Sequence, residues 1–124
     1  MLLLAVGCAD KGGDSGAAPT FTQVYDQVLQ PSCAFSTCHG SSNGSGDFGF
    51  TDAAGAYAAL LDVESLDSPG SVRVVPGDPD SSYLMAKLEA AAGIVGDPMP
   101  PPSGLEVDRA ALVRDWIAAG ALQD

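Results

Sequence analysis

The chain has 124 residues, of which 16 are acidic and 5 are basic, so its net charge is −11. This length allows one small domain, and the acidic balance argues against binding of nucleic acid or anionic lipid, which require a basic surface. The charge favours a basic partner or simply keeps the protein soluble, and the second interpretation is preferred. Aromatic residues make up only 6% of the chain, so the predicted core is thin unless an apolar group absent from the sequence completes it.

The first eight residues, MLLLAVGC, form a short apolar run that ends in small residues before Cys8. The run resembles the end of a bacterial lipoprotein signal, which implies export and acylation of Cys8. It has no positively charged start and is too short to span a bilayer, and the alternative is a frayed apolar terminus. Residues 9–19 are rich in Gly, Ala and Ser and are predicted to be a flexible linker to a domain at 20–124.

The first helix of this domain is predicted from a capping box and an apolar stripe. Thr20 and Gln23 can satisfy each other's backbone N–H groups at the start of a helix over 21–30. Pro31 is expected to stop it, because proline has no N–H to donate. The residues expected to face the core are Phe21, Val24, Tyr25, Val28 and Leu29.

Three more helices are predicted, each preceded by a side chain that can cap it. They cover 52–62, 79–92 and 109–119, with caps at Thr51 or Asp52, at Asp78 and at Asp108, and with Gly93 and Gly120 ending the last two. Their inward residues are Ala53, Ala56, Tyr57, Leu60, Leu61, Leu84, Met85, Leu88, Ala92, Leu112, Val113, Trp116 and Ile117. With no long alternating run, the fold class is all-α, about four helices with long loops.

The stretch CAFSTCHG places Cys33, Cys38 and the only histidine, His39, within seven residues. A zinc site needs a fourth ligand or an open position, and blue copper needs a second histidine. A Cys–His nucleophilic pair is disfavoured, because adjacent side chains point different ways and an exported thiol tends to oxidise. A plain Cys33–Cys38 disulfide beside an idle histidine remains an open alternative.

Covalent haem is the interpretation that accounts for all three residues. A histidine directly after a cysteine, with a second cysteine a few residues earlier, is typical of c-type haem attachment. The two thiols add to the porphyrin vinyl groups, and the histidine ligates the iron. Four residues separate the cysteines here, whereas the usual motif has two.

A haem used for electron transfer needs a second axial ligand, and the only histidine is already assigned. Methionine is the other common choice. Met85 falls on the apolar stripe of a helix and is predicted to be core filler. Met99 lies in the proline-rich stretch 97–102, DPMPPP, which predicts a stiff, extended arm for a thioether ligand.

The order of these motifs resembles the small monohaem cytochrome c domains of secreted bacterial proteins, in particular the planctomycete type. The resemblance covers about residues 20–122. The segments that carry it are the predicted first helix, C-x4-C-H-G at 33–40, VPGDPDSSYL at 75–84, MPP at 99–101 and WIAAGA at 116–121.

This resemblance implies a cytochrome c-like fold around one covalent haem c, with the first and last helices crossing near the haem edge. Cys33 and Cys38 would form thioethers, His39 would be the proximal ligand and Met99 the distal one, so that the metal ligands are His39 and Met99. Trp116 would pack near the ring, although a core tryptophan explains it equally well.

The function expected from this resemblance is electron transfer rather than catalysis. The protein would be a monomer that serves a redox partner protein and touches the membrane only through a lipid on Cys8. It would face the periplasm, with the outer membrane favoured because Ala9 does not look like an inner-membrane retention residue. Two alternatives stay open: a haem sensor or enzyme in which Met99 is displaceable, and a haem-free disulfide lipoprotein that acts as a binding module.

Arg73 is the positive residue nearest to the VPGDP motif. It is a candidate partner for a haem propionate, but a solvated surface arginine is the favoured interpretation.

Overall fold

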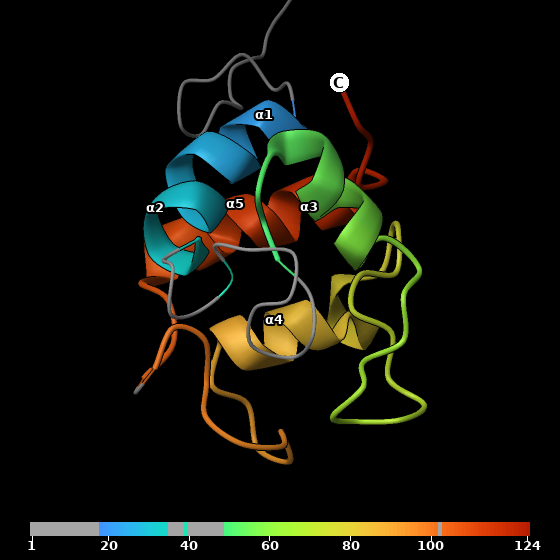
Figure 1. The fold of residues 1–124 in the computed structure, drawn as a ribbon, viewed down its shortest axis with the longest axis vertical. Coiled ribbons are helices and arrows are strands. Elements are labelled where there is room, and N and C mark those ends of the chain that lie inside the picture. The colour runs from blue at the N-terminus through green and yellow to red at the C-terminus, as the bar shows by residue number, and fades with distance from the viewer. Residues whose placement is uncertain (1–17, 35–38, 40–48, 102) are drawn as a thin grey trace, which may run out of the picture.

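The computed structural model describes residues 18–34, 39, 49–101 and 103–124. Within these ranges the chain forms a small all-α fold of four helices joined by long loops, and no strand is present (Figure 1). No helix of this described part is long and apolar enough to cross a membrane. The all-α prediction is therefore confirmed at the level of fold class.

The first helix is continuous from Phe21 to Cys33 and has three parts: α1 (Phe21–Val24), the π-helical turn η3 (Tyr25–Leu29) and α2 (Gln30–Cys33). The predicted capping box is present. The Gln23 N–H donates to Thr20 Oγ1 at 3.1 Å, and the Thr20 N–H donates to Gln23 Oε1 at 2.8 Å.

The prediction that Pro31 ends the first helix is wrong, because the helix continues to Cys33. A proline inside an α-helix lacks one N–H, and its ring collides with the carbonyl four residues earlier. In this helix the turn just before the proline is widened, and the Gln30 N–H donates to the Tyr25 carbonyl, five residues back. The wide turn gives the proline ring room, so the helix continues past it instead of stopping.

The helix α3 (Ala53–Leu60) begins as predicted at Asp52, whose Oδ1 accepts the N–H of Gly55 at 2.7 Å. Its inward residues Ala56 and Leu60 are fully buried. The chain from 61 to 75 then forms two isolated bridges, in which Leu61 pairs with Val74 and Glu64 with Val72.

The predicted third helix is shorter than expected and is split. Asp78 caps a 3-10 turn, η5 (Pro79–Ser81), and the helix α4 covers Tyr83–Leu88. It ends before Ala92 because Ala90 adopts φ +54°, which leaves the helical region. The Ala91 N–H then donates to the Ala86 carbonyl at 2.9 Å, closing the helix end. Ala92, predicted to face inward, is exposed.

The last helix, α5, covers Val107–Ala118 and starts after Glu106 without a side-chain cap, so Asp108 lies in its first turn and is not the cap. It packs between the first helix and the α4–η5 segment, as the central red ribbon of Figure 1 shows. Its stripe Val113, Trp116 and Ile117 is buried as predicted, and Leu112 is half-buried.

Trp116 lies at the centre of an aromatic cluster that joins three helices. Its ring centroid lies 5.1 Å from that of Phe21 in α1 and 6.3 Å from that of Tyr57 in α3. The indole Nε1–H donates to the Leu122 carbonyl at 3.0 Å, and the Tyr57 hydroxyl donates to the Ala121 carbonyl at 2.7 Å. The cluster therefore fixes the C-terminal segment against the first helix and α3.

Candidate functional site

Cys33 is the last residue of α2 and belongs to the buried core, with 8% of its surface exposed. The position of this cysteine depends on the wide turn η3, because the helix continues from that turn past Pro31 to Cys33. The predicted attachment residue is therefore held by a helix end that packs on the core. Cys8 and Cys38 lie outside the described residues.

His39 is also buried, at 8% exposure, and is connected directly to Cys33. Its backbone N–H donates to the Cys33 carbonyl at 3.1 Å. Its own carbonyl accepts the N–H of Phe50 at 2.5 Å, and the two rings lie side by side with centroids 5.3 Å apart. The structure thus brings Cys33 and His39 together, and Phe50 packs beside the imidazole.

Met99 lies with α4, and it is partly buried against the core cluster that contains Cys33. Two hydrogen bonds hold its arm to the C-terminal end of α4. The Met99 N–H donates to the Lys87 carbonyl at 2.9 Å, and the Leu105 N–H donates to the Leu88 carbonyl at 2.8 Å. The proline-rich arm is therefore a loop attached to α4 at both ends. Met85 is only 1% exposed in the core, which agrees with its prediction as core filler.

Gly104 allows this arm to approach α4 closely. It has φ +91°, and a Cβ added there would lie 2.5 Å from the Leu88 carbonyl oxygen. A Gly104→Ala variant should lose stability for two reasons. The left-handed backbone should cost roughly 1–2 kcal/mol, and displacement of the arm by the new Cβ should cost about 1–3 kcal/mol more. Urea unfolding measures the loss.

The matched control for Gly104 is Gly93, which has nearly the same φ, +89°, but no atom within 4 Å of an added Cβ. Gly93→Ala should show the backbone cost alone, roughly 1–2 kcal/mol. Equal losses in the two variants would mean that the arm does not press against the Leu88 carbonyl.

The favoured interpretation of Arg73 as a solvated surface arginine is wrong. Only 9% of the residue is exposed, and Nη1 donates to the Ala59 carbonyl at 2.7 Å near the end of α3. Burial lowers the pKa of Arg73, because desolvation penalises the charged form, and the nearby Asp67 opposes that shift. Sequence reasoning missed this burial, since charged residues are rarely fully buried.

Arg109 is a second residue that sequence reasoning missed. It lies in α5 and reaches the first helix, where its Nε and Nη2 donate to the Gln27 carbonyl at 3.1 and 2.7 Å. Nη2 also donates to the hydroxyl of Ser32, the neighbour of Cys33, and Nη1 pairs with Glu106 at 2.9 Å. No signal in the sequence points to it, because the contact depends on how α5 packs on the first helix.

Two donors among the described residues suit haem iron. No group of three or more His, Cys, Asp and Glu side chains occurs in the described part of the chain. What the described residues offer is one buried imidazole, that of His39, and one thioether partly buried against the core cluster, that of Met99. A thioether is a poor zinc ligand but a common axial ligand of c-type haem.

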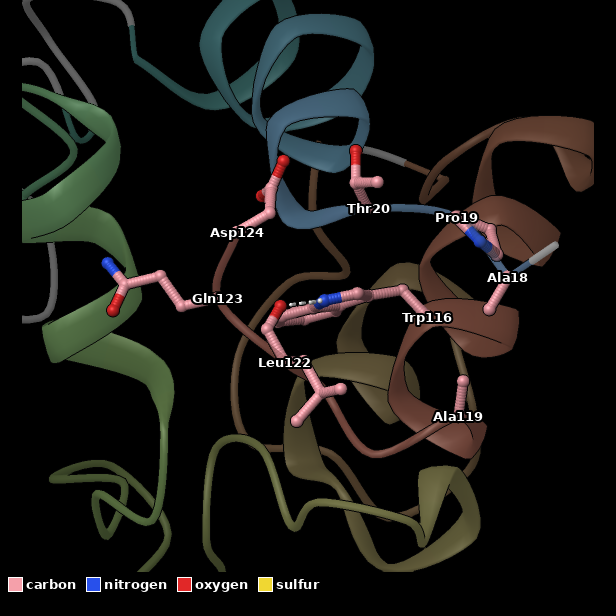
Figure 2. Close-up of a pocket in the computed structure, with 8 residues that line it drawn as sticks. All are labelled: Ala18, Pro19, Thr20, Trp116, Ala119, Leu122, Gln123 and Asp124. Carbon is pink, nitrogen blue, oxygen red and sulfur yellow. Dashed lines mark hydrogen bonds between the residues drawn. The ribbon is translucent and has the colours of Figure 1, made fainter.

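A hollow among the described residues lies away from these side chains. It has a volume of about 300 Å³ and is lined by residues 18–20, Trp116, Ala119 and 122–124 (Figure 2). Figure 2 shows the hydrogen bond from the Trp116 indole to the Leu122 carbonyl, which shapes this hollow. None of Cys33, His39 and Met99 lines it.

Comparison of the chain with protein-family models, with curated proteins and with solved structures found no match. The cytochrome c resemblance therefore stays a prediction, and the case for a function rests on the residues themselves.

Proposed function

We propose that the protein is an electron carrier with one covalently bound haem c. The observation that carries the proposal is the connection of Cys33 to His39, both buried, through the His39 N–H and the Cys33 carbonyl. The backbone of the chain's only histidine is thus tied to that of a buried cysteine at a helix end, and this arrangement suits the c-type attachment motif. Cys33 and Cys38 would form the thioethers, and His39 and Met99 would be the axial ligands.

Each residue then has a definite chemical role. A haem bound there would supply one-electron chemistry through its ferrous and ferric iron. His39 and Met99 would hold the iron between them and would leave no site on it for a substrate. A methionine ligand would raise the reduction potential relative to a second histidine. Apolar neighbours of His39 such as Phe50 would raise it further, because they would disfavour the additional positive charge of the ferric form.

The cellular setting is part of the same proposal. Export with a lipid on Cys8 would place the domain in the cell envelope, facing the periplasm, where its partner would be another redox protein. The net charge of −11 suits a partner with a basic docking surface, and such pairs associate faster at low salt.

The proposal is tested by making the protein in a host that attaches haem to c-type cytochromes. The purified protein should be red and should stay coloured on a denaturing gel, because thioethers survive unfolding. A Cys33→Ser/Cys38→Ser variant should lose the colour on the gel. A colourless wild-type protein whose mass is lower by two hydrogens would instead support the haem-free disulfide module.

A further inference from the structure

Val95 is attached to the helix α4 through both of its backbone polar groups. Its N–H donates to the Tyr83 hydroxyl at 2.8 Å, and its carbonyl accepts from Lys87 Nζ at 2.7 Å. Tyr83 and Lys87 stand four residues apart in α4, so their side chains share one face of the helix. Because Val95 is 47% exposed, water could satisfy both backbone groups. The two side chains therefore fix the position of the loop and are not required to pair a buried polar group.

These two bonds hold the part of the loop that precedes Met99. The loop joins α4 to α5 and lies below α4 in Figure 1. Within residues 92–98, all of which the structure describes, Val95 alone makes a hydrogen bond to another described residue. The next attachment is the Met99 N–H, which donates to the Lys87 carbonyl at 2.9 Å. The path of the chain into Met99 thus depends on the side chains of Tyr83 and Lys87.

We propose that Tyr83 and Lys87 are positioning residues that keep the Met99 thioether at the iron, an inference that rests on the proposed function. A thioether on a segment held in place has a high effective concentration at its binding position, whereas a segment free to move lowers that concentration. The two side chains act on Met99 through the backbone of Val95. They would decide whether Met99 stays bound, as a carrier requires, or yields to another ligand, as in the sensor or enzyme alternative.

The test removes each hydrogen bond separately, with Tyr83→Phe and Lys87→Leu made as holoprotein in the haem-attaching host. Tyr83→Phe loses only the hydroxyl, and Lys87→Leu keeps the backbone carbonyl that accepts the Met99 N–H. Imidazole is the probe, because it binds ferric haem only when Met99 has left, and its apparent affinity reports the fraction of open sites. Each variant should bind imidazole roughly two- to tenfold more tightly than the wild type, as expected for the loss of one hydrogen bond. Above about pH 8 imidazole is neutral, so the lost charge of Lys87 does not by itself change this binding.

Two further measurements separate positioning from a general loss of stability. The charge-transfer band that a methionine sulfur gives to ferric haem should weaken in both variants, at temperatures well below unfolding. The Val95 amide should exchange its hydrogen roughly tenfold or more slowly in the wild type than in an unstructured chain, and this protection should fall in Tyr83→Phe. The exchange measurement reports the hydrogen bond itself and does not depend on the iron.

The matched control is Tyr57→Phe, which makes the same chemical change at a hydroxyl that donates to the Ala121 carbonyl at 2.7 Å, away from the loop with Met99. It should leave imidazole binding and the sulfur band unchanged. Unchanged imidazole binding in both Tyr83→Phe and Lys87→Leu overturns the inference, and so does an equal gain in Tyr57→Phe. A red wild-type protein without the sulfur band also overturns it, because Met99 is then not the ligand. A colourless wild-type protein is distinguishable from all of these results, since it overturns the proposed function and the inference with it.

Discussion

Replacement of Met99 by leucine is expected to lower the reduction potential by on the order of 100 mV or more, since axial ligands spread haem potentials over about 0.8 V. Leucine fills a similar volume but has no sulfur, so the partly buried packing of the arm on the core survives while the proposed ligand is lost. An axial position should then open, and the ferrous protein should bind carbon monoxide. Potentiometric titration and the visible spectrum under carbon monoxide measure both effects.

Met85 gives the matched control. It is the other methionine of the described residues, lies in α4 and is 1% exposed in the core. Met85→Leu should leave the potential and the spectrum unchanged and should cost less than about 1.5 kcal/mol of stability. An effect of Met85→Leu on the potential, with none from Met99→Leu, would reassign the ligand. Ready binding of carbon monoxide by the wild type would favour the sensor or enzyme alternative, in which Met99 is displaceable.

Replacement of Trp116 by alanine is expected to cost about 3–5 kcal/mol of the free energy of unfolding. The indole is 1% exposed, packs on Phe21 and Tyr57, and donates to the Leu122 carbonyl. Small domains have only about 5–15 kcal/mol of stability in all, so the variant should be close to unfolding. Urea titration followed by far-UV circular dichroism measures the loss.

Trp116→Phe separates the packing of the ring from the hydrogen bond of the indole. It keeps an aromatic ring against Phe21 but removes the part-buried hydrogen bond from Nε1 to the Leu122 carbonyl, so it should cost about 0.5–1.5 kcal/mol. A loss below about 1 kcal/mol for Trp116→Ala would contradict the central place of the tryptophan in the core.

The parts of the fold that depend on neighbouring residues could be predicted from the sequence. The capping box of Thr20 and Gln23 and the cap at Asp52 are local interactions, and the apolar stripes of the first and last helices are buried as expected. Cys33 and His39 are both buried and joined by a backbone hydrogen bond, and their roles in haem binding remain a prediction.

The errors arise where a distant part of the chain supplies what the local sequence lacks. Pro31 should end a helix, but the wide turn of η3 accommodates the ring and Arg109 of α5 serves the Gln27 carbonyl. Arg73 should lie on the surface, but the Ala59 carbonyl receives its guanidinium. Neither partner can be identified from spacing, because both contacts depend on how the helices pack.

The two ends of the described chain lie together, so both mark the same pole of the described fold. The Thr22 N–H donates to the Asp124 carboxylate at 3.0 Å, and residues 18–20 and 122–124 share one hollow. In Figure 1, which sets the longest axis vertical, the C-terminus is at the top and the orange segment just before α5 is at the bottom. A domain immobilised through either end on an electrode or a bead would therefore present the opposite pole, with the proline-rich arm, to the solution.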